Sequence, residues 1–594
     1  MSLRAFLSVL LVPVLLAGCL SETPAETAAP EEPLVERVPP AVWQANLTKP
    51  IHEAIESALY TISADDGTKL SLTVHLPEDL PKDTKVPTLL QITPYQPLTL
   101  RKSTPFGTDS VGQTSWASYV LRGAAYVEAD ARGTNGSEGC LDFGGAKDRA
   151  DAKAFVEWIR AQPWSDGVVV TDGVSHPGMG SVVAHAAVPG LTAALAHAPV
   201  VSYYQDEWLQ GAKFEDQFNG PAYQAIELAP PAYTDPDSAA AQAAPCTGET
   251  TLDYTLPEGT FTPEWADRDL SRHTPQEKIP ILLTHGFVDH NVHPDHTQLY
   301  WDALPDDHPK HLVMGWWYHS WPDMTDHPAK SSDDTLASFD DLRHRWLDAT
   351  LFGLDNGLWA EPRVLVEDSR GTWHESDDWP LSPSETTTWY GSAEGGLGDG
   401  EPAEGTATYT DRFPAYRGEW TDASVTFRSE PLEKDMLVNG APTVDLVASS
   451  SATNTKWVVY LLDEAPDGTW NRITHGYADS HSHGGEDKWL AMEPGAAYEW
   501  VVKLMPIATV VEEGHRIVLL VASQDSRNLM KPDGTWNCWD DHRDPQGCHD
   551  PSGIVPAESV GRAENTIHLG PDGTRVHFAW ADPETTQKVP WPAV

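Results

Sequence analysis

The sharpest chemical signal in the sequence is a serine between a strand-like run and a stretch of small residues. Residues 173–178 read GVSHPG; the apolar run 168–173 leads into them and the small-residue stretch 179–187 follows. A serine at such a strand-to-helix turn exposes its hydroxyl, and the next backbone N–H points to where an oxyanion forms. We therefore predict Ser175 as a nucleophile; the alternative is a Gly-Ser turn without chemistry.

A serine hydroxyl is a weak nucleophile without a base that a carboxylate orients. Downstream of Ser175, Asp289 follows the apolar run 281–284 and His319 follows the apolar run 312–314. Sites in doubly wound sheets form beyond the carboxyl ends of the strands, so we expect the three residues at one rim of a sheet. Their order of serine, acid and histidine is that of α/β hydrolases, which predicts a catalytic triad.

Histidines and acids near the predicted triad acid could instead bind a metal ion, because imidazole and carboxylate are ligands for zinc or manganese. The cluster consists of His285, Asp289, His290, His293, Asp295 and His296. It lacks the zinc-hydrolase spacing H-E-x-x-H, so we interpret it as a polar loop and helix start. We expect no metal and no cofactor, and a metallohydrolase remains an alternative.

The elements that must position these residues are short apolar runs with helical patterns between them, which are typical of buried parallel strands. The predicted strands are residues 88–93, 124–130, 168–173, 193–197, 279–284 and 311–315. Apolar residues at helical spacing predict a helix over 148–160. The alternation of strands and helices predicts a doubly wound, mostly parallel α/β sheet, forming an α/β-hydrolase domain over 51–361.

Two further regions differ from this alternation of strands and helices in their composition and pattern. Residues from about 200 to 275 hold many Pro, Ala, Tyr and Asp residues and break the rhythm, which predicts a cap inserted over the sheet. Over residues 362–594, short β-branched runs alternate with Gly- and Pro-containing turns, which predicts an all-β sandwich of jelly-roll type. The predicted strands there are residues 424–427, 443–447, 456–462, 499–504 and 516–522.

The N-terminal residues 1–19 predict export. A positively charged start precedes the apolar run 6–17, which is too short for an ordinary membrane span. Residues 16–19, LAGC, resemble the lipobox of bacterial-type lipoproteins, which implies lipidation of Cys19; a plain secretory signal is the alternative. Residues 20–50 have the composition of a disordered tether. We expect an exported lipoprotein, at the cell surface or in the periplasm, that contacts membrane only through this anchor.

If Cys19 is lipidated, four cysteines remain, and an exported protein can form disulfides from them. They are Cys140, Cys246, Cys538 and Cys548. The last two lie ten residues apart in a loop-like stretch and form the expected bridge; the first two would then pair. A zinc site with His542 and His549 is the alternative, although the spacing is not that of a zinc knuckle.

The charge balance excludes some partners. Lys and Arg together number 39 and Asp and Glu together number 88, which gives a formal net charge of −49. Such a surface repels nucleic acid and anionic lipid headgroups. Acidic surfaces suit salty water, where counter-ions screen the self-repulsion. A marine or halophilic host and a merely soluble acidic enzyme both fit this composition.

Several motifs, taken in order, resemble the X-prolyl dipeptidyl aminopeptidase and cocaine esterase family of serine hydrolases. The matching segments are 93–95 (TPY), 130–139 (DARGTNGSEG), 173–178 (GVSHPG), 285–289 (HGFVD), 315–319 (GWWYH) and 514–516 (GHR). The resemblance covers roughly residues 55–580. It implies an α/β-hydrolase domain with a helical cap and a C-terminal jelly roll, with Ser175, Asp289 and His319 as the triad.

The resemblance also implies an oxyanion hole formed by the Tyr95 hydroxyl and the backbone N–H of His176, since preformed donors favour the developing negative charge. The sequence departs from the family here: His176 stands where the family usually has Tyr, and Pro177 follows it. Pro177 lacks an N–H, but the oxyanion donor is one residue earlier, so the chemistry is expected to survive. The departures bear on the substrate pocket instead.

The expected reaction is acyl transfer to water through an acyl-enzyme. Family members cleave dipeptides after proline, or esters and amides of small acyl groups; the sequence leaves peptide and ester substrates open, and also the oligomeric state. A Pro-specific aminopeptidase must bind a free amine, and the cap offers carboxylates for this, Asp206, Glu207, Glu215 and Asp216. The alternative class is a non-catalytic surface lipoprotein that binds carbohydrate or peptide.

Overall fold

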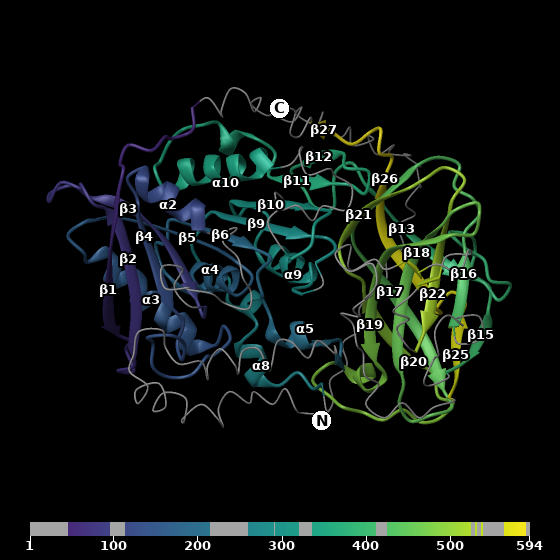
Figure 1. Ribbon diagram of the computed structural model, residues 1–594. Helices are drawn as coiled ribbons and strands as arrows, with labels where there is room; N and C mark the ends of the chain where they lie inside the picture. Colours follow the sequence, from purple (N-terminus) through teal and green to yellow (C-terminus); the bar gives the residue numbers. More distant parts are fainter. Residues whose placement is uncertain are drawn as a thin grey trace, which may run out of the picture.

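An eleven-stranded sheet is the framework of the N-terminal part of the computed structural model (Figure 1). The structure describes residues 46–95, 113–213, 259–289, 291–319, 336–411, 424–523, 529–530, 536–537 and 563–589. In their order across the sheet, the strands are β1 (Ile55–Ser63), β2 (Lys69–Pro77), β4 (Ala125–Asp130), β3 (Val86–Thr93), β5 (Ser165–Val174), β6 (Ala193–His197), β9 (Ile281–Gly286), β10 (Lys310–Gly315), β11 (Val364–Glu367), β12 (Trp373–Ser376) and β27 (Lys588–Val589).

The central strands of this sheet, from β4 to β11 in the sheet order, run parallel to one another. Antiparallel pairs add β2 and β1 at one end and β12 and β27 at the other. The six strands predicted from apolar runs are confirmed, as is the α/β-hydrolase fold. Because parallel strands place their carboxyl ends at the same edge, the segments that follow β3, β5, β9 and β10 lie along one rim.

Helices cover both faces of the sheet (Figure 1). Alternate residues of a strand point to opposite faces. Leu90 of β3 packs in the core shared with α3, α4 and α9, whereas Leu89 packs in the core shared with α2 and α10. The helices are α2 (Gln113–Leu121), α3 (Ala146–Arg160), α4 (His176–Ala187), α9 (Asp295–Ala303) and α10 (Leu336–Thr350). The predicted helix over 148–160 is therefore confirmed as α3.

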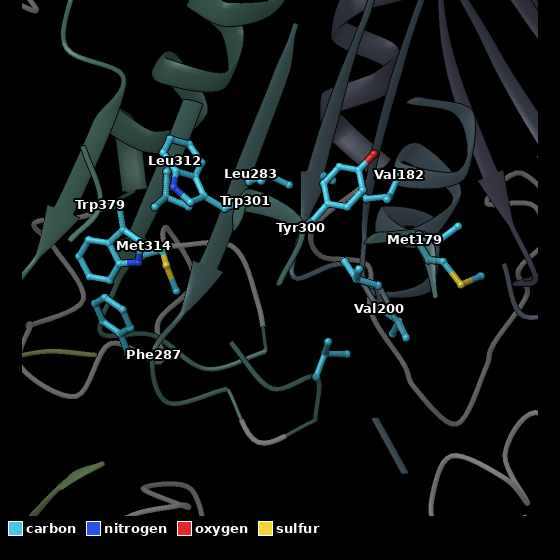
Figure 2. Packing of buried hydrophobic residues seen from close by; sticks show 14 of the residues in the cluster. Met179, Val182, Val200, Leu283, Phe287, Tyr300, Trp301, Leu312, Met314 and Trp379 are labelled. Atoms are coloured by element: carbon cyan, nitrogen blue, oxygen red, sulfur yellow. The ribbon is translucent and has the colours of Figure 1, made fainter. Parts of the chain in front are cut away.

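Figure 2 shows part of the hydrophobic core that contains Leu90 and is shared with α3, α4 and α9. Met179 of α4 and Tyr300 of α9 lie against the side of the sheet that carries Leu283 of β9, and all three are buried. Further along, Phe287 stacks on Trp379 with the ring centroids 6.2 Å apart. This packing fixes α4 and α9 against the strands whose ends carry the predicted site.

The sheet continues past the predicted end of the hydrolase domain at residue 361. β11, β12 and β27 all follow that position in the chain and belong to this sheet. Their sequences did not reveal this, because β11 and β12 have four residues each and β27 has two, too few to show a period. A single boundary between residues 361 and 362 therefore does not describe how the chain divides.

The predicted cap lies between β6 and β9, and residues 214–258 of it are outside the described residues. Its described elements are α5 (Tyr203–Glu207), β7 (Trp208–Leu209), β8 (Ala212–Lys213), α8 (Pro263–Asp267) and η2 (Leu270–His273). The β7–β8 hairpin turns at Gln210 and contacts the C-terminal domain. Leu209 and Ala212 pack with that domain's core, and the Gln210 side-chain oxygen accepts a hydrogen bond of 2.8 Å from the Lys503 N–H.

The C-terminal part is a β-sandwich, which confirms the predicted all-β domain. Leu446, Val459 and Leu519 are fully buried within its core. The larger sheet contains β13 (Glu385–Gly391), β14 (Leu397–Gly398), β15 (Gly405–Thr410), β17 (Met436–Ser450), β20 (Tyr498–Lys503), β21 (Ile507–Val511), β25 (Glu564–Leu569) and β26 (Arg575–Ala581). The smaller sheet contains β16 (Ser424–Arg428), β18 (Lys456–Glu464), β19 (Trp470–Asp479) and β22 (Arg516–Ala522). The remaining short elements are η3 (Leu358–Ala360), η5 (Ser480–Gly484), β23 (Leu529–Met530) and β24 (Trp536–Asn537).

Several sequence predictions fall on residues outside those described. These are the signal with Cys19, the tether as far as residue 45, Glu215, Asp216, Cys246, His290, Cys538, His542, Cys548 and His549. Cys140 is disulfide-bonded, and its pairing with Cys246 stays a prediction. Among the described residues, no helix combines the length and the apolar character needed to cross a membrane.

Candidate active site

Ser175 occupies the turn between β5 and α4. β5 ends at Val174 and α4 begins at His176, so the reversal of direction falls on Ser175 alone. Its φ of 66° is in the left-handed region, which costs a non-glycine residue roughly 1–3 kcal/mol. The turn is held by two backbone bonds of 2.9 Å, from the Ser175 N–H to the His197 carbonyl and from the Met179 N–H to the Ser175 carbonyl. This is the geometry of a nucleophile elbow.

Glycines on either side of the elbow make the close packing possible. A Cβ on Gly173 would lie 2.3 Å from the carbonyl oxygen of Pro177, and one on Gly178 would lie 2.6 Å from that of His197. Both contacts are far inside van der Waals distance and involve backbone atoms that cannot yield. Pro177 fits because the first turn of a helix has no use for its missing N–H. The small residues of the motif are therefore steric requirements of the turn.

Asp289 follows β9 and is buried, with an exposed fraction of 4%. Its Oδ1 accepts the backbone N–H groups of Asn291 at 2.9 Å and Val292 at 3.1 Å. Its Oδ2 faces two imidazoles, with His319 Nδ1 at 2.7 Å and His285 Nε2 at 3.3 Å. Burial alone would raise the pKa of Asp289, but the charge of His319 and the side-chain interactions with His285 and His319 outweigh it and hold the pKa well below its ordinary value. The carboxylate is therefore ionised.

His319 follows β10 and donates from Nδ1 to Asp289, so the structure brings the predicted acid and base together. Its side chain is 19% exposed. Burial lowers the pKa of His319, but the charge and hydrogen bond of Asp289 and the charge of Asp206 outweigh this and raise it above the ordinary value. Ser175, Asp289 and His319 thus follow three parallel strands at the same rim of the sheet, as predicted.

The loops that carry the acid and the base are packed on each other. The Phe287 N–H donates to the Gly315 carbonyl at 2.7 Å. A Cβ on Gly286 would lie 1.9 Å from the Trp317 carbonyl oxygen, so only glycine allows this approach. Gly286 in the motif 285–289 therefore lets this segment approach the segment 315–319 that carries His319.

Tyr95 and His176 lie together beside the elbow. Tyr95 follows β3, the neighbour of β5 in the sheet, and its ring centroid is 6.5 Å from that of His176. The Asn135 side-chain amide fixes the Tyr95 carbonyl at 2.7 Å. The ring of His176 is buried, bonded through Nδ1 to the Tyr203 hydroxyl at 3.1 Å, and burial lowers its pKa to about 3. His176 is thus uncharged at neutral pH.

The cap also supplies two buried carboxylates, of which Asp206 acts on His319. Asp206 and Glu207 of α5 are each 5% exposed. Asp206 Oδ1 lies 3.5 Å from His296 Nε2, and the charge of Asp206 contributes to the raised pKa of His319. The sequence named both acids, but only the fold separates them from the many others in this acidic chain.

The predicted alternative metal cluster has a different arrangement. Both ring nitrogens of His285 are engaged by protein groups, Nδ1 by the Thr297 hydroxyl and Nε2 by the Val292 carbonyl, each at 2.8 Å. His296 Nδ1 accepts the Val201 N–H at 3.1 Å. Within the part of the chain that the structure describes, no group of three or more His, Cys, Asp or Glu side chains is placed to hold a metal ion.

Two family models match the chain in the order of its two folded parts. Residues 66–321 match the X-Pro dipeptidyl-peptidase (S15 family), and residues 356–573 match the X-Pro dipeptidyl-peptidase C-terminal non-catalytic domain. The chain belongs to this family of serine hydrolases. The resemblance inferred from the motifs is therefore confirmed, and the S15 membership favours an enzyme over a non-catalytic lipoprotein.

Relatives of this S15-family hydrolase agree. The cocaine esterase of Rhodococcus sp. (strain MB1 Bresler) is 25% identical over 579 residues, covering 85% of this chain and 95% of the relative. The crystal structure of an aminopeptidase from a marine sediment archaeon, Thaumarchaeota archaeon, has a TM-score of 0.67 at 20% identity and covers 94% of this chain and 100% of its own. An alpha-amino acid ester hydrolase structure has a TM-score of 0.64 at 19% identity, covering 96% and 100%. At these identities the two structures establish the fold alone.

Proposed function

We propose that the chain hydrolyses ester or amide bonds with Ser175 as nucleophile, His319 as general base and acid, and Asp289 as the acid that orients it. His319 takes the proton of the Ser175 hydroxyl as this attacks the carbonyl carbon, and returns it to the leaving group. An acyl-enzyme on Ser175 results, which a water molecule activated by His319 hydrolyses in the second half of the cycle.

The observation that carries this proposal is the way in which His319 meets its carboxylate. His319 uses Nδ1 toward the buried Asp289, which directs Nε2 away from the acid. His374 is also buried against an aspartate, but there Nε2 binds Asp368 at 2.8 Å and the Thr586 hydroxyl occupies Nδ1 at 2.9 Å. Such a ring has no nitrogen to offer a substrate. The His319 arrangement suits a base that acts on a neighbouring hydroxyl.

The oxyanion hole completes the proposal. The Tyr95 hydroxyl and the backbone N–H of His176, at the positive N-terminal end of α4, would bind the developing negative charge. Tyr95→Phe is then expected to lower kcat by about ten- to a thousandfold, as for the loss of one such donor. Tyr300→Phe is the matched control, because its hydroxyl bonds to His185 at 2.8 Å, away from the elbow. A Tyr95→Phe variant altered only in KM would point to substrate packing instead.

We propose further that the substrate carries a free α-amine next to the acyl group. Asp206 and Glu207 provide two buried carboxylates on α5, and Asp206 is close enough to influence His319. An ammonium group placed between them would gain charge-assisted hydrogen bonds. The names X-Pro dipeptidyl-peptidase, aminopeptidase and alpha-amino acid ester hydrolase among the similar proteins all describe substrates of this kind.

A substrate panel with a covalent probe tests both parts. A phosphonate serine-hydrolase probe is expected to label wild type at Ser175 and leave Ser175→Ala unlabelled, with turnover lost by about 10⁴-fold or more. Ala-Pro-p-nitroanilide should be cleaved faster than its N-acetylated form, and Asp206→Asn should raise KM about tenfold or more for the free amine only. Turnover that survives in a folded Ser175→Ala variant would refute the triad. Equal rates for both nitroanilides would refute the amine requirement.

We also propose, from residues 16–19 alone, that the enzyme is exported and lipidated at Cys19. One acyl chain binds a membrane only marginally, whereas two anchor it stably. The tether over 20–50 would then hold the folded part away from the bilayer.

A further inference from the structure

His285 is a buried residue beside the acid that the proposed reaction leaves without a role. It lies on β9, four residues before Asp289, and its exposed fraction is 0%. Nε2 lies 2.8 Å from the Val292 carbonyl oxygen and 3.3 Å from Asp289 Oδ2. A carbonyl oxygen only accepts hydrogen bonds, so Nε2 carries a hydrogen, and both of its neighbours are acceptors.

The opposite side of the ring is also fixed. The Thr297 hydroxyl occupies Nδ1 at 2.8 Å, and Thr297 is itself fully buried in α9. The ring therefore joins three consecutive segments of the chain: the strand β9, the turn that presents Asp289 and Val292, and the helix that follows. Rotation of the ring would break bonds at both nitrogens.

We propose that His285 is a positioning residue for the triad acid. Its Nε2–H donates to the Val292 carbonyl, which fixes the turn that supplies the donors to Oδ1, and Nε2 also lies 3.3 Å from Asp289 Oδ2, the oxygen that receives His319 Nδ1. The carboxylate is thereby held with Oδ2 toward His319. The inference rests on the proposed triad and adds a residue that touches neither substrate nor the reacting atoms.

The effect on chemistry follows from the geometry of proton transfer. Proton transfer requires the ring of His319 to be aligned with the hydroxyl of Ser175. A misplacement near 1 Å typically lowers the rate about a hundredfold. Nε2 of His285 also lies beside Oδ2, so two imidazoles, and not His319 alone, interact with the negative charge of this oxygen. The charged groups that face His319 are Asp289 from the turn after β9 and Asp206 from α5.

The direct test compares His285→Phe with His308→Phe. His308 is the matched control, because it is a buried histidine of the same domain whose Nε2 also bonds to a backbone carbonyl, that of Ile279, at 2.8 Å, and it does not touch Asp289. For each variant, kcat and KM are measured per site labelled by the phosphonate probe, together with the pH dependence of kcat/KM. Counting labelled sites removes any fraction that fails to fold.

We expect His285→Phe to lower kcat by about ten- to a hundredfold per labelled site while KM stays within about a factor of two. The apparent pKa of the acidic limb should change. It rises if Oδ2 keeps its bond to His319 and its negative charge is no longer shared with His285, and it falls if Asp289 turns away from His319. Retained kcat would overturn the proposal. So would a lowered kcat with an unmoved pKa, or an equal loss in His308→Phe, since these mean a general effect on the fold.

A second pair of variants, with smaller changes, tests the proposal if His285→Phe does not fold. Thr297→Val removes the hydroxyl from His285 Nδ1 and keeps the side-chain volume, and Thr586→Val does the same at His374, whose carboxylate partner is Asp368. Only Thr297→Val should lower kcat and move the pKa; equal behaviour of the two variants would overturn the proposal. Absence of probe labelling at Ser175 in wild type would instead refute the triad itself, so the two failures are distinguishable.

Discussion

Ser175 keeps a backbone conformation that the surrounding structure imposes. Its φ of 66° is accessible to glycine without strain but costs other residues. Ser175→Gly and Ser175→Ala should therefore both abolish turnover, while the glycine variant should melt at a higher temperature because it relieves the strain. Thermal unfolding of the two inactive variants measures this difference. A glycine variant that melts below the alanine variant would show that the turn stores no strain.

The pH dependence of activity follows from the groups around His319. Asp289 and Asp206 raise the pKa of His319 against the effect of burial. The base must be neutral, so activity is present above this pKa and is lost as pH falls through it, with the limb above the ordinary value of about 6.5.

Asp206→Asn tests this at single-residue scale. It removes one of the two charges, so the apparent pKa of kcat/KM should fall, and the difference from wild type should persist at high salt because a buried charge pair is screened much less than an exposed one. The N-acetylated nitroanilide is the substrate for this measurement, since it does not require the amine site. An unmoved acidic limb in Asp206→Asn would contradict the assigned influence of Asp206.

At the scale of elements, α4 can approach the sheet closely because Gly178 and Gly180 in its first turns have no side chain. The Cβ that Gly178 lacks would lie 2.6 Å from the His197 carbonyl oxygen. Gly178→Ala should destabilise the fold by about 1–3 kcal/mol, the usual range for overpacking, and lower kcat by displacing Ser175. Gly398→Ala is the control, because a Cβ there meets nothing within 4 Å. Denaturation and kinetics of both variants decide, and a stable, fully active Gly178→Ala would contradict the packing argument.

The elements that could be predicted from the sequence are those with a clear hydrophobic period or a distinctive composition. Parallel strands such as β5 and β9 are continuous apolar runs, and the catalytic candidates follow them directly, so the triad could be read from order and context. The edge strand β1 was not predicted, although it forms nine residue pairs with β2. Most of its side chains are exposed, so it shows no buried face.

Other parts of the site depend on contacts that no local pattern encodes. Asp206 could not be separated from other acids in a chain with 88 of them until the fold placed it near His319. His285 suggested a metal ligand because of its neighbours in sequence. Its contacts with Thr297 and Val292 arise only when the strand, turn and helix pack, and these assign it a different role.

At the scale of the whole molecule, the cap segment is hydrogen-bonded to the C-terminal domain at two places. The Phe261 N–H donates to the Glu486 carbonyl of the C-terminal domain at 2.7 Å, and Gln210 bonds to Lys503 of β20. The segment that carries Asp206 therefore lies between the hydrolase sheet and the sandwich. The sandwich therefore contacts the segment that carries Asp206.

The proposed anchor also belongs to the whole molecule. Cys19→Ser should release the enzyme from the membrane fraction or leave an unprocessed precursor, because the thiol is the lipidation point. Mass spectrometry of the mature N-terminus, with membrane and soluble fractions separated, measures both. The catalytic rate of the released enzyme should match wild type. A wild-type protein that is free in solution and starts at another residue would refute the lipobox assignment.

The pairing of β27 with β12 determines when the hydrolase sheet can be completed. Trp373 and His374 pair with Val589 and Lys588, so the ribosome must make the whole sandwich before this strand exists. Until then the outer edge of β12 offers unpaired N–H and C=O groups to any other strand. Folding during synthesis therefore cannot finish one domain before the next, and a fragment that stops at the end of β12 would carry an open, association-prone edge.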